Sequence, residues 1–386
     1  MAVSLHARFL DHLARGIDDL QLAKDFPAGL QRAGLTVERP RDPAHGDLST
    51  NAAMILAKLS GTHPRPLAEK LADWLAKLED VAAADVAGPG FINIRLTDQA
   101  WRDELAVIAD QKDRYGMSPI GAGKTVNIEF VSANPTGPMH MGHCRGAVVG
   151  DALANLLAFT GHRVIREYYI NDAGGQVDVL ARSAHHRYRE ALGESLGEIA
   201  EGLYPGDYLK PVGEALAADF GGRYADAPET DWLAIFRART VAAMMETIRE
   251  DLALLGISHD RFASEADLVA AGKPDDAEAW MRARDLVYDG VLEPPKGEIS
   301  KDWEPIALPL FRSTRFGDDQ DRAIRKPDGG WTYFGVDLAY HFEKARDADE
   351  LIDIWGADHA GTVKRIVAAA EALTEGRKRF DVKLVQ

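Results

Sequence analysis

The stretch TVNIEFVSANPTGPMHMGHCRGAVVGDALANLLAFTGHRVIREYYI, residues 125–170, decides the fold. Its apolar start at 125–131 predicts a strand, and the Ala-rich apolar run at 144–159 predicts a helix that Gly161 ends. Residues 163–170 predict a second strand. Because a strand, a helix and a strand in this order usually form parallel neighbours in one sheet, the stretch predicts a parallel α/β fold.

The alternation of strands and helices returns near the end of the chain. Between about residues 189 and 305 the apolar pattern is mainly helical and less regular, which indicates an insertion. After it, strands are predicted at 331–334, 351–355 and 380–385, and helices at 336–345 and 362–373. The insertion therefore separates two halves of one predicted sheet.

The first part of the chain predicts a separate small domain. Apolar residues with helical spacing occur at 5–20, 52–59 and 66–78. A Gly-Pro-Gly turn then precedes alternating apolar residues at 91–96, which indicate a strand. These elements predict an α+β domain, and the Gly- and Pro-rich segment 115–124 is the predicted linker.

The composition is that of an ordinary soluble globular protein, with 386 residues, 46% hydrophobic and 27% charged. The single cysteine, Cys144, excludes a disulfide framework and a cysteine-rich zinc site. Neither a signal peptide nor an apolar run of membrane-spanning length is evident, so we expect a cytoplasmic protein with no membrane partner. The net charge of −16 argues against nucleic acid, unless basic residues gather on one face.

The segment SANPTGPMHMGHCRG, residues 132–146, has the features of an anion site. It joins a predicted strand to a predicted helix, where open α/β sheets bind ligands. His140 and His143 share one face of the helix entrance, Gly142 permits close approach of a ligand, and the helix N-terminus attracts phosphate. Structural or solvated histidines are the alternative, whereas a metal site lacks a third ligand nearby.

The tetrapeptide HMGH resembles the His-x-Gly-His signature of class I aminoacyl-tRNA synthetases. The longer block IEFVSANPTGPMHMGHCRGAVVGDALANLL, followed by REYYINDAGGQ, is similar to arginyl-tRNA synthetases in particular, and the resemblance covers the whole chain. It implies ATP-dependent ligation of L-arginine to its cognate tRNA through an arginyl-adenylate, with release of AMP and pyrophosphate. ATP with Mg²⁺, L-arginine and the arginine-accepting tRNA are the implied partners; no protein-bound metal and a monomer are expected.

The resemblance also implies a domain plan. Residues 1–112 are the expected N-terminal α+β domain, which contacts tRNA in the family. Residues 113–386 are the expected Rossmann-like catalytic domain, with the insertion at about 189–305. Before the insertion, ARSAHHRYRE at 181–190 either faces RNA or forms a solvated helix face.

The resemblance assigns site residues by their match to the family's motifs. The catalytic histidines are His140 and His143, and the ATP-binding residues are Pro138, His140, Gly142, His143, Gly356 and Asp358. The residues that hold arginine are Glu129, Tyr333 and Asp337 at the guanidinium, and Ser132 and Asn134 at the α-amino and carboxylate end. Carboxylates suit a guanidinium because the two groups pair through two parallel hydrogen bonds.

Each assignment has a structural alternative. Glu129 could be an ordinary exposed carboxylate on a strand, and Asp337 could be a charge that stabilises the start of a helix. Tyr333 could be an aromatic residue of the core. Asp358, in the WGADH segment, fits a helix N-cap as well as a ligand of the ribose hydroxyls.

The chain departs from the family pattern in one place. The second, lysine-rich signature of class I synthetases is not found, and the resemblance would place it, and the anticodon-binding domain, beyond Gln386. We therefore expect a fragment that activates arginine weakly or not at all by itself. A small-molecule adenylyltransferase and a non-catalytic synthetase-like binding module are the competing hypotheses.

Overall fold

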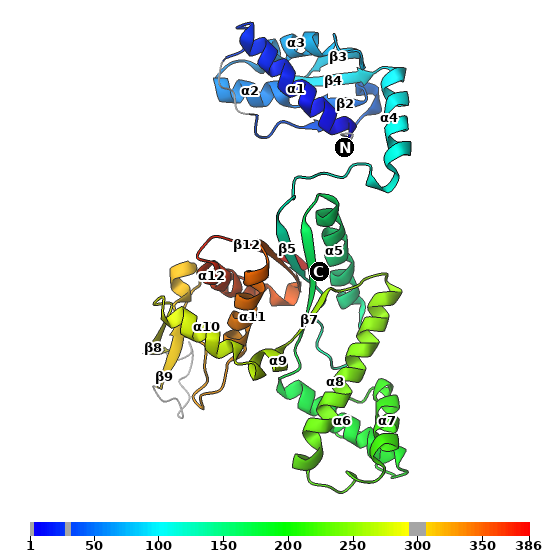
Figure 1. Cartoon of the computed structure of the whole chain (residues 1–386), viewed down its shortest axis with the longest axis vertical. Coiled ribbons are helices and arrows are strands. Elements are labelled where there is room, and N and C mark those ends of the chain that lie inside the picture. Colours follow the sequence, from blue (N-terminus) through cyan, green and yellow to red (C-terminus); the bar gives the residue numbers. More distant parts are fainter. Residues whose placement is uncertain (1–3, 28–31, 293–305) are drawn as a thin grey trace. The chain divides into compact units, whose positions relative to one another are not determined.

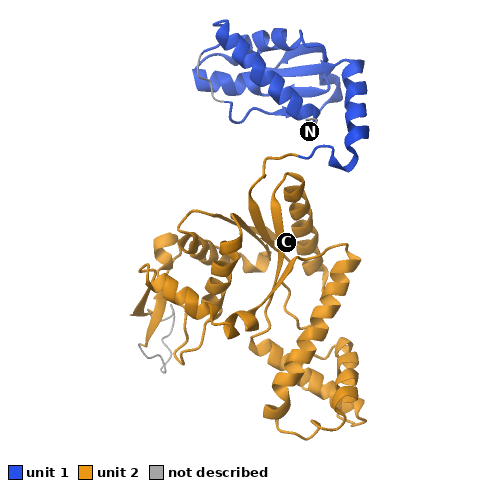
Figure 2. Ribbon diagram, viewed as in Figure 1, with its two compact units in different colours: residues 1–117 blue, residues 118–386 orange. Residues whose placement is uncertain are grey.

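The computed structural model describes residues 4–27, 32–292 and 306–386, so the last part of the predicted insertion, 293–305, lies outside the described residues. The chain divides into two compact units, residues 1–117 and residues 118–386 (Figure 2). None of the described helices has both the length and the apolar character that crossing a membrane requires.

The N-terminal unit is an antiparallel sheet covered by helices. Its strand order is β1-β2-β4-β3, with bounds Val37–Glu38, Leu48–Thr50, Phe91–Leu96 and Val81–Ala87. Its helices are α1 (Leu5–Leu22), α2 (Ala52–Ser60), α3 (Pro64–Leu75) and α4 (Asp98–Gln111). Phe9, Leu13 and Ile17 recur at helical spacing and are fully buried, which explains why α1 packs on this core.

Sequence reasoning missed β3 and α4 in this unit. The β3 segment VAAADVA is rich in alanine, which favours helices, yet it pairs with β4 along its whole length. Tertiary pairing therefore overrides the local preference.

The second unit contains a five-stranded parallel sheet in the order β12-β11-β5-β6-β7. The strands are β5 (Thr125–Glu129), β6 (Arg163–Ile170), β7 (Arg261–Ser264), β11 (Glu350–Gly356) and β12 (Arg379–Val385). From β5 the chain adds β6 and β7 on one side and later β11 and β12 on the other. The order therefore reverses between β5 and β11, which is the switch point where such sheets bind ligands. The predicted α/β fold is confirmed.

Helices cover both faces of this sheet. Figure 1 shows α5 (Met141–Phe159) on one side, and α11 (Tyr333–Asp347) and α12 (Val363–Thr374) on the other. Right-handed crossovers that run in opposite directions from the switch point produce this two-sided cover. Helix α5 comes very close to the end of β5, because Gly150 lies directly against the ring of Phe130.

The region between β6 and β9 is only partly helical. Helices α6 (Gly175–Ala191), α7 (Lys210–Phe220) and α8 (Glu229–Leu254) share a core of their own, and the short 3₁₀ turn Asp207–Leu209 belongs to it. Strand β7 then returns to the parallel sheet, so the helical insertion is not continuous over 189–305. Helices α9 (Glu265–Ala270) and α10 (Lys273–Arg282) follow it. A small antiparallel sheet, β10-β9-β8, is formed by Arg322–Ala323, Ala307–Phe311 and Val287–Val291.

The strand predicted at 331–334 is wrong. Thr332 is the N-cap of α11, and its hydroxyl oxygen accepts a hydrogen bond from the N–H of Gly335 at 3.0 Å while donating to the carbonyl of Ala323. The aromatic residues at 331–334 favour a strand locally, but this cap starts the helix at Tyr333. Tyr333 and Asp337 therefore lie on one helix.

Two glycines on α5 provide a matched test of this packing. A Cβ at Gly150 would lie 2.3–2.6 Å from side-chain atoms of Phe130, whereas a Cβ at Gly146 meets nothing within 4 Å. We expect Gly150→Ala to lower the free energy of unfolding by about 1–3 kcal/mol through overpacking. Gly146→Ala should raise it by about 0.5–1 kcal/mol, because alanine is the better helix former. Urea denaturation measures both, and equal stabilities would contradict the close approach.

Candidate functional site

A cavity of about 750 Å³ opens at the carboxyl ends of β5 and β11, at the switch point of the sheet. Most of the residues predicted from the sequence line it: Glu129, Ser132, Asn134, His140, Gly142, His143, Asp337, Gly356 and Asp358. Pro138 and Tyr333 are not among the lining residues. Segments from Glu129 to Gln386 therefore meet at one site, as the topology requires.

The two histidines stack at the N-terminus of α5. Their ring centroids are 3.7 Å apart at an interplanar angle of 18°. The Nδ1 atom of His140 accepts from the N–H of Gly142 at 3.1 Å, and the Nδ1 atom of His143 accepts from the N–H of His140 at 3.3 Å. Because each Nδ1 is an acceptor, the proton of each neutral ring is on Nε2. Burial, and then the neighbouring His140, lower the pKa of His143, so this ring is a neutral donor at pH 7.

The backbone between β5 and this helix is strained. Val131 and Ser132 have φ values of +70° and +40°, a region that β-branched residues in particular avoid. The hydroxyl of Ser132 donates to Glu129 Oε1 at 2.9 Å and accepts from the N–H of Tyr169 at 3.1 Å. These bonds help to hold the turn, and such strain is commonly found at ligand sites.

A row of charged side chains crosses the sheet beneath the cavity. Asp353 on β11 is in register with Glu129 on β5, Glu129 with Glu167 on β6, and Glu167 with Arg261 on β7. The three carboxylates are buried, with exposed fractions of 0%, 6% and 1%. Adjacent buried carboxylates repel each other and lose their hydration, so the row requires cations close to it.

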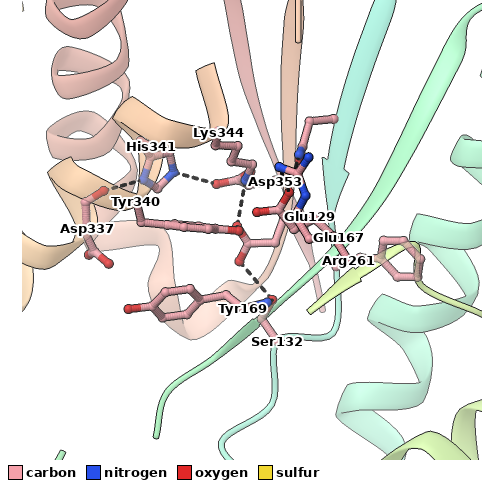
Figure 3. A network of polar contacts seen from close by, with 12 residues as sticks. Glu129, Ser132, Glu167, Tyr169, Arg261, Asp337, Tyr340, His341, Lys344 and Asp353 are labelled. Carbon is pink, nitrogen blue, oxygen red and sulfur yellow. Dashed lines mark hydrogen bonds and ion pairs between the residues drawn. The ribbon is translucent and has the colours of Figure 1, made fainter. Parts of the chain in front are cut away.

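Helix α11 supplies these cations (Figure 3). Lys344 is buried and forms ion pairs with Glu129 at 2.7 Å and with Asp353. His341 bonds Asp353 through Nε2 at 3.1 Å. Burial alone would lower the pKa of His341, but the hydrogen bond and charge of Asp353 raise it above its usual value. The hydroxyl of Tyr340 donates to Glu129 at 2.9 Å, so the carboxylate of Glu129 is fully engaged within the protein.

The carboxylate of Asp337 is not balanced in this way. Within residues 4–27, 32–292 and 306–386, no side chain or N–H forms a hydrogen bond or ion pair with this carboxylate; the contact of His341 Nδ1, at 2.8 Å, is with the backbone carbonyl of Asp337. Burial raises the pKa of Asp337 to about 7; the charge of His341 opposes this shift, and the charges of Glu129 and Glu265 add to it. A carboxylate in such surroundings is a site for a cation.

Aromatic rings stand beside Asp337. The rings of Tyr169 and Tyr340 have centroids 4.5 Å apart, and both residues line the cavity. The hydroxyl of Tyr169 donates to the buried carboxylate of Glu265 at 2.9 Å. Burial raises the pKa of Glu265. Flat aromatic walls with carboxylates around them suit a planar cation.

The opposite end of the cavity lies where β11 ends. Asp358 belongs to the 3₁₀ turn Ala357–Thr362, and its carboxylate is exposed. The N-cap of this turn is Gly356, so the alternative in which Asp358 caps a helix is wrong. A Cβ at Gly356 would lie 2.4 Å from Oδ1 of Asp358, so any larger residue there would displace this carboxylate from its present position.

Sequence reasoning missed several residues of the site: Tyr169, Glu265, Tyr340, His341, Lys344 and Asp353. Three of them follow Asp337 on α11 at helical spacing, so correct placement of the helix start would have found them. The signal for Asp353 is a single charge inside the apolar strand LIDIW. A charge at a buried strand position indicates a partner elsewhere in the fold.

Comparisons with known proteins agree on one family. A family model described as "Arginyl tRNA synthetase N terminal domain" matches residues 9–96, and one described as "tRNA synthetases class I (R), catalytic domain" matches residues 104–201. A protein of Novosphingobium aromaticivorans named "Arginine--tRNA ligase" is 66% identical over 388 residues, which cover 100% of this chain and 66% of that protein. A protein of the same name from Cereibacter sphaeroides is 58% identical, covering 94% and 63%. The chain thus spans just under two thirds of the length of these relatives.

Solved structures show the same likeness. A putative arginyl-tRNA synthetase of Campylobacter jejuni has a TM-score of 0.63 and 28% identity, covering 75% of this chain and 60% of that one. The Thermus thermophilus arginyl-tRNA synthetase has a TM-score of 0.63 at 19% identity, covering 98% and 65%. The second likeness supports the fold alone.

The buried cation of the charged row can be tested by its removal. Lys344→Met keeps most of the side-chain volume but leaves two adjacent carboxylates without their partner. We expect the free energy of unfolding to fall by about 3–5 kcal/mol, the usual cost of breaking a buried ion pair from one side. Lys326→Met, at an exposed position, is the control and should change it by less than about 0.5 kcal/mol. Urea denaturation followed by circular dichroism makes the measurement; equal stability of the two variants would show that Lys344 is dispensable.

Proposed function

Because the chain belongs to the arginyl-tRNA synthetase family, we propose that its cavity binds L-arginine and ATP and forms an arginyl-adenylate. The arginyl group then passes to the cognate tRNA, and AMP and pyrophosphate are released. Neither a small-molecule adenylyltransferase nor a non-catalytic module finds support among the relatives. A cytoplasmic location and a monomeric state remain predictions.

The unbalanced carboxylate of Asp337 carries this proposal. A guanidinium is permanently charged and planar, so it keeps its charge when buried and can pair with the carboxylate through two hydrogen bonds. The rings of Tyr169 and Tyr340 line the same part of the cavity and suit a planar cation. Binding of the guanidinium supplies the positive charge that Asp337 lacks in the free protein.

The other proposed arginine ligands differ in their surroundings. The carboxylate of Glu129 already accepts hydrogen bonds from Lys344, Tyr340 and Ser132. Glu129 therefore contributes to guanidinium binding as a member of this hydrogen-bond network. Tyr333 lies one turn before Asp337 and is 67% exposed, so a contact with arginine is confined to the mouth of the cavity. Ser132 and Asn134 line the cavity after the strained turn, where we place the α-amino and carboxylate end of arginine.

We place the triphosphate of ATP at the start of α5. In the part of the chain that the structure describes, no group bonds Nε2 of His140 or His143, so these N–H groups can donate to a ligand. The helix N-terminus adds N–H groups and the positive end of its dipole. Gly142 and Pro138 belong to the same stretch, and Asp358 beside Gly356 suits the ribose hydroxyls. Mg²⁺ is expected to come with the ATP phosphates, whose charge it balances.

The proposed reaction depends on positioning. The carboxylate oxygen of arginine attacks the α-phosphorus of ATP, and the bond to the leaving pyrophosphate breaks. The histidines donate hydrogen bonds where negative charge accumulates, so they stabilise the transition state more than the substrates. A hydroxyl of the terminal tRNA ribose then attacks the arginyl carbonyl and displaces AMP. We further propose that residues 1–112 contact the tRNA, and that residues 113–386 catalyse the reaction.

Selective arginine binding tests the proposal. We expect the chain to bind L-arginine and to discriminate against lysine and citrulline, which lack either the planar shape or the charge. Asp337→Asn should weaken arginine binding by at least about 100-fold, because a buried charge pair broken from one side costs about 3–5 kcal/mol. Isothermal titration calorimetry measures this. The matched control is Asp276→Asn, an exposed carboxylate in the first turn of α10, which should bind arginine as the unchanged chain does. Equal affinities of all three ligands would refute the substrate assignment.

The pH dependence of binding follows from the raised pKa. Asp337 has a pKa of about 7 in the free protein, and only its ionised form pairs with a guanidinium. Arginine binding should therefore weaken as the pH falls below 7, by about tenfold between pH 8 and pH 6. Calorimetry over this range should show the loss in the unchanged chain and none in Asp337→Asn. A flat profile in the unchanged chain would contradict the role of Asp337.

A further inference from the structure

Hydrogen bonds from the helical region reach the loop before α5 at three points: Asn134 bonds Gln176 on α6, the N–H of Met139 donates to Asp251 Oδ2 on α8 at 3.4 Å, and Tyr208 bonds the middle of the loop. The hydroxyl of Tyr208 donates to the backbone carbonyl of Thr136 at 2.8 Å. Thr136 lies in the middle of loop 132–140, which ends at His140, the N-cap of α5. The two residues are 72 positions apart in the sequence, so this bond is a tertiary contact and not a local turn.

The helical core fixes the position of Tyr208. Its neighbour Leu209 is completely buried among α6, α7 and α8. Arg187 on α6 donates from Nη2 to the carbonyl of Pro205 at 2.8 Å, which holds the preceding backbone. The 3₁₀ turn that carries Tyr208 is therefore anchored on both sides.

Two glycines make room for the tyrosine ring. A Cβ at Gly206 would lie 2.1 Å from a ring carbon of Tyr208, and a Cβ at Gly137 would lie 3.1 Å from its hydroxyl oxygen. Neither glycine has a positive φ, so backbone conformation does not demand them. The space that the two glycines leave lets the ring of Tyr208 reach Thr136. The contact therefore depends on glycine at both positions.

The hydroxyl of Tyr208 remains a donor. Burial, and then the nearby Tyr204, raise its pKa above the usual value, so the proton stays on the oxygen at neutral pH. The earlier part of the loop has separate anchors. The hydroxyl of Tyr168 donates to the carbonyl of Ala133 at 2.8 Å, and Asn134 donates to Gln176 at 3.1 Å.

We propose that Tyr208 is a positioning residue, through which the helical region α6–α8 holds loop 132–140 and thereby sets the histidine pair that faces the triphosphate of ATP. The effect of Tyr208 on ATP binding rests on the function proposed above, whereas the effect of Tyr208 on the loop does not. The early anchors of Ser132 and Asn134 do not involve Tyr208, so arginine binding should depend on it little.

Two tyrosines of this segment form a matched pair. Tyr208→Phe removes the hydroxyl and keeps the ring. Tyr204→Phe makes the same change four residues earlier, at another partly buried tyrosine of the same core. Gly206→Ala keeps the hydroxyl but displaces the ring, so it disturbs the contact by a different route. Hydrogen–deuterium exchange of the ligand-free chain, together with calorimetric titration with ATP and with arginine, compares all three with the unchanged chain.

For Tyr208→Phe and Gly206→Ala we expect faster exchange in peptides that cover 132–140, by about fivefold, the factor that corresponds to about 1 kcal/mol for one hydrogen bond. The dissociation constant for ATP should rise by a similar factor, while that for arginine changes less than about twofold. Tyr204→Phe should match the unchanged chain in every measurement.

Unchanged exchange at 132–140 in Tyr208→Phe would overturn the proposal. Faster exchange throughout residues 118–386 would overturn it too, because Tyr208 would then act only in general stability. If the unchanged chain binds no ATP, the proposed function fails, and the exchange data still decide whether Tyr208 holds the loop.

Discussion

The ion pairs of Lys344 with Glu129 and Asp353 are the interaction on which this site depends. Parallel pairing places these two carboxylates side by side at the centre of the sheet, next to Glu167. Their repulsion in a dry interior would oppose the pairing of β5 with β11. Lys344, from α11, neutralises this charge and ties the helix to both central strands. The switch point therefore exists in its present form because one helix contributes a buried cation.

The same network leaves the charges around the cavity unevenly balanced. Glu129 is balanced by Lys344, and Asp353 is balanced by Lys344 and His341. Asp337, on the same helix, has no such partner in the part of the chain that the structure describes, and its pKa rises to about 7. The carboxylates of Glu129 and Asp353 in the sheet thus have partners within the protein. Asp337 is the carboxylate to which we assign the ligand. A permanently charged guanidinium gains from this arrangement, whereas a neutral analogue does not.

Backbone geometry, rather than charge, builds the end of the cavity where we propose that ATP binds. Val131 and Ser132 take up a strained turn, and the loop that follows brings two stacked histidines to a helix N-terminus. Neutral rings whose Nδ1 atoms are both occupied can only donate outward through Nε2. Bonds from the sheet and from the helical region hold the loop, because strain at a ligand site has to be offset by its surroundings.

The sequence by itself determined the α/β fold, the parallel order around 125–170 and nine of the residues that line the cavity. The fold could be predicted because apolar periodicity is a local property of the chain, whereas the site residues were assigned by their match to the motifs of the family that the sequence resembles. The sequence could not determine the start of α11, since the aromatic run at 331–334 favours a strand until the Thr332 cap is formed. Nor could it distinguish Glu129 from Asp337, two carboxylates assigned the same role. Only the tertiary structure decided that Lys344 balances Glu129, while Asp337 has no partner for its carboxylate among the described residues, because charge balance depends on groups about 200 residues apart.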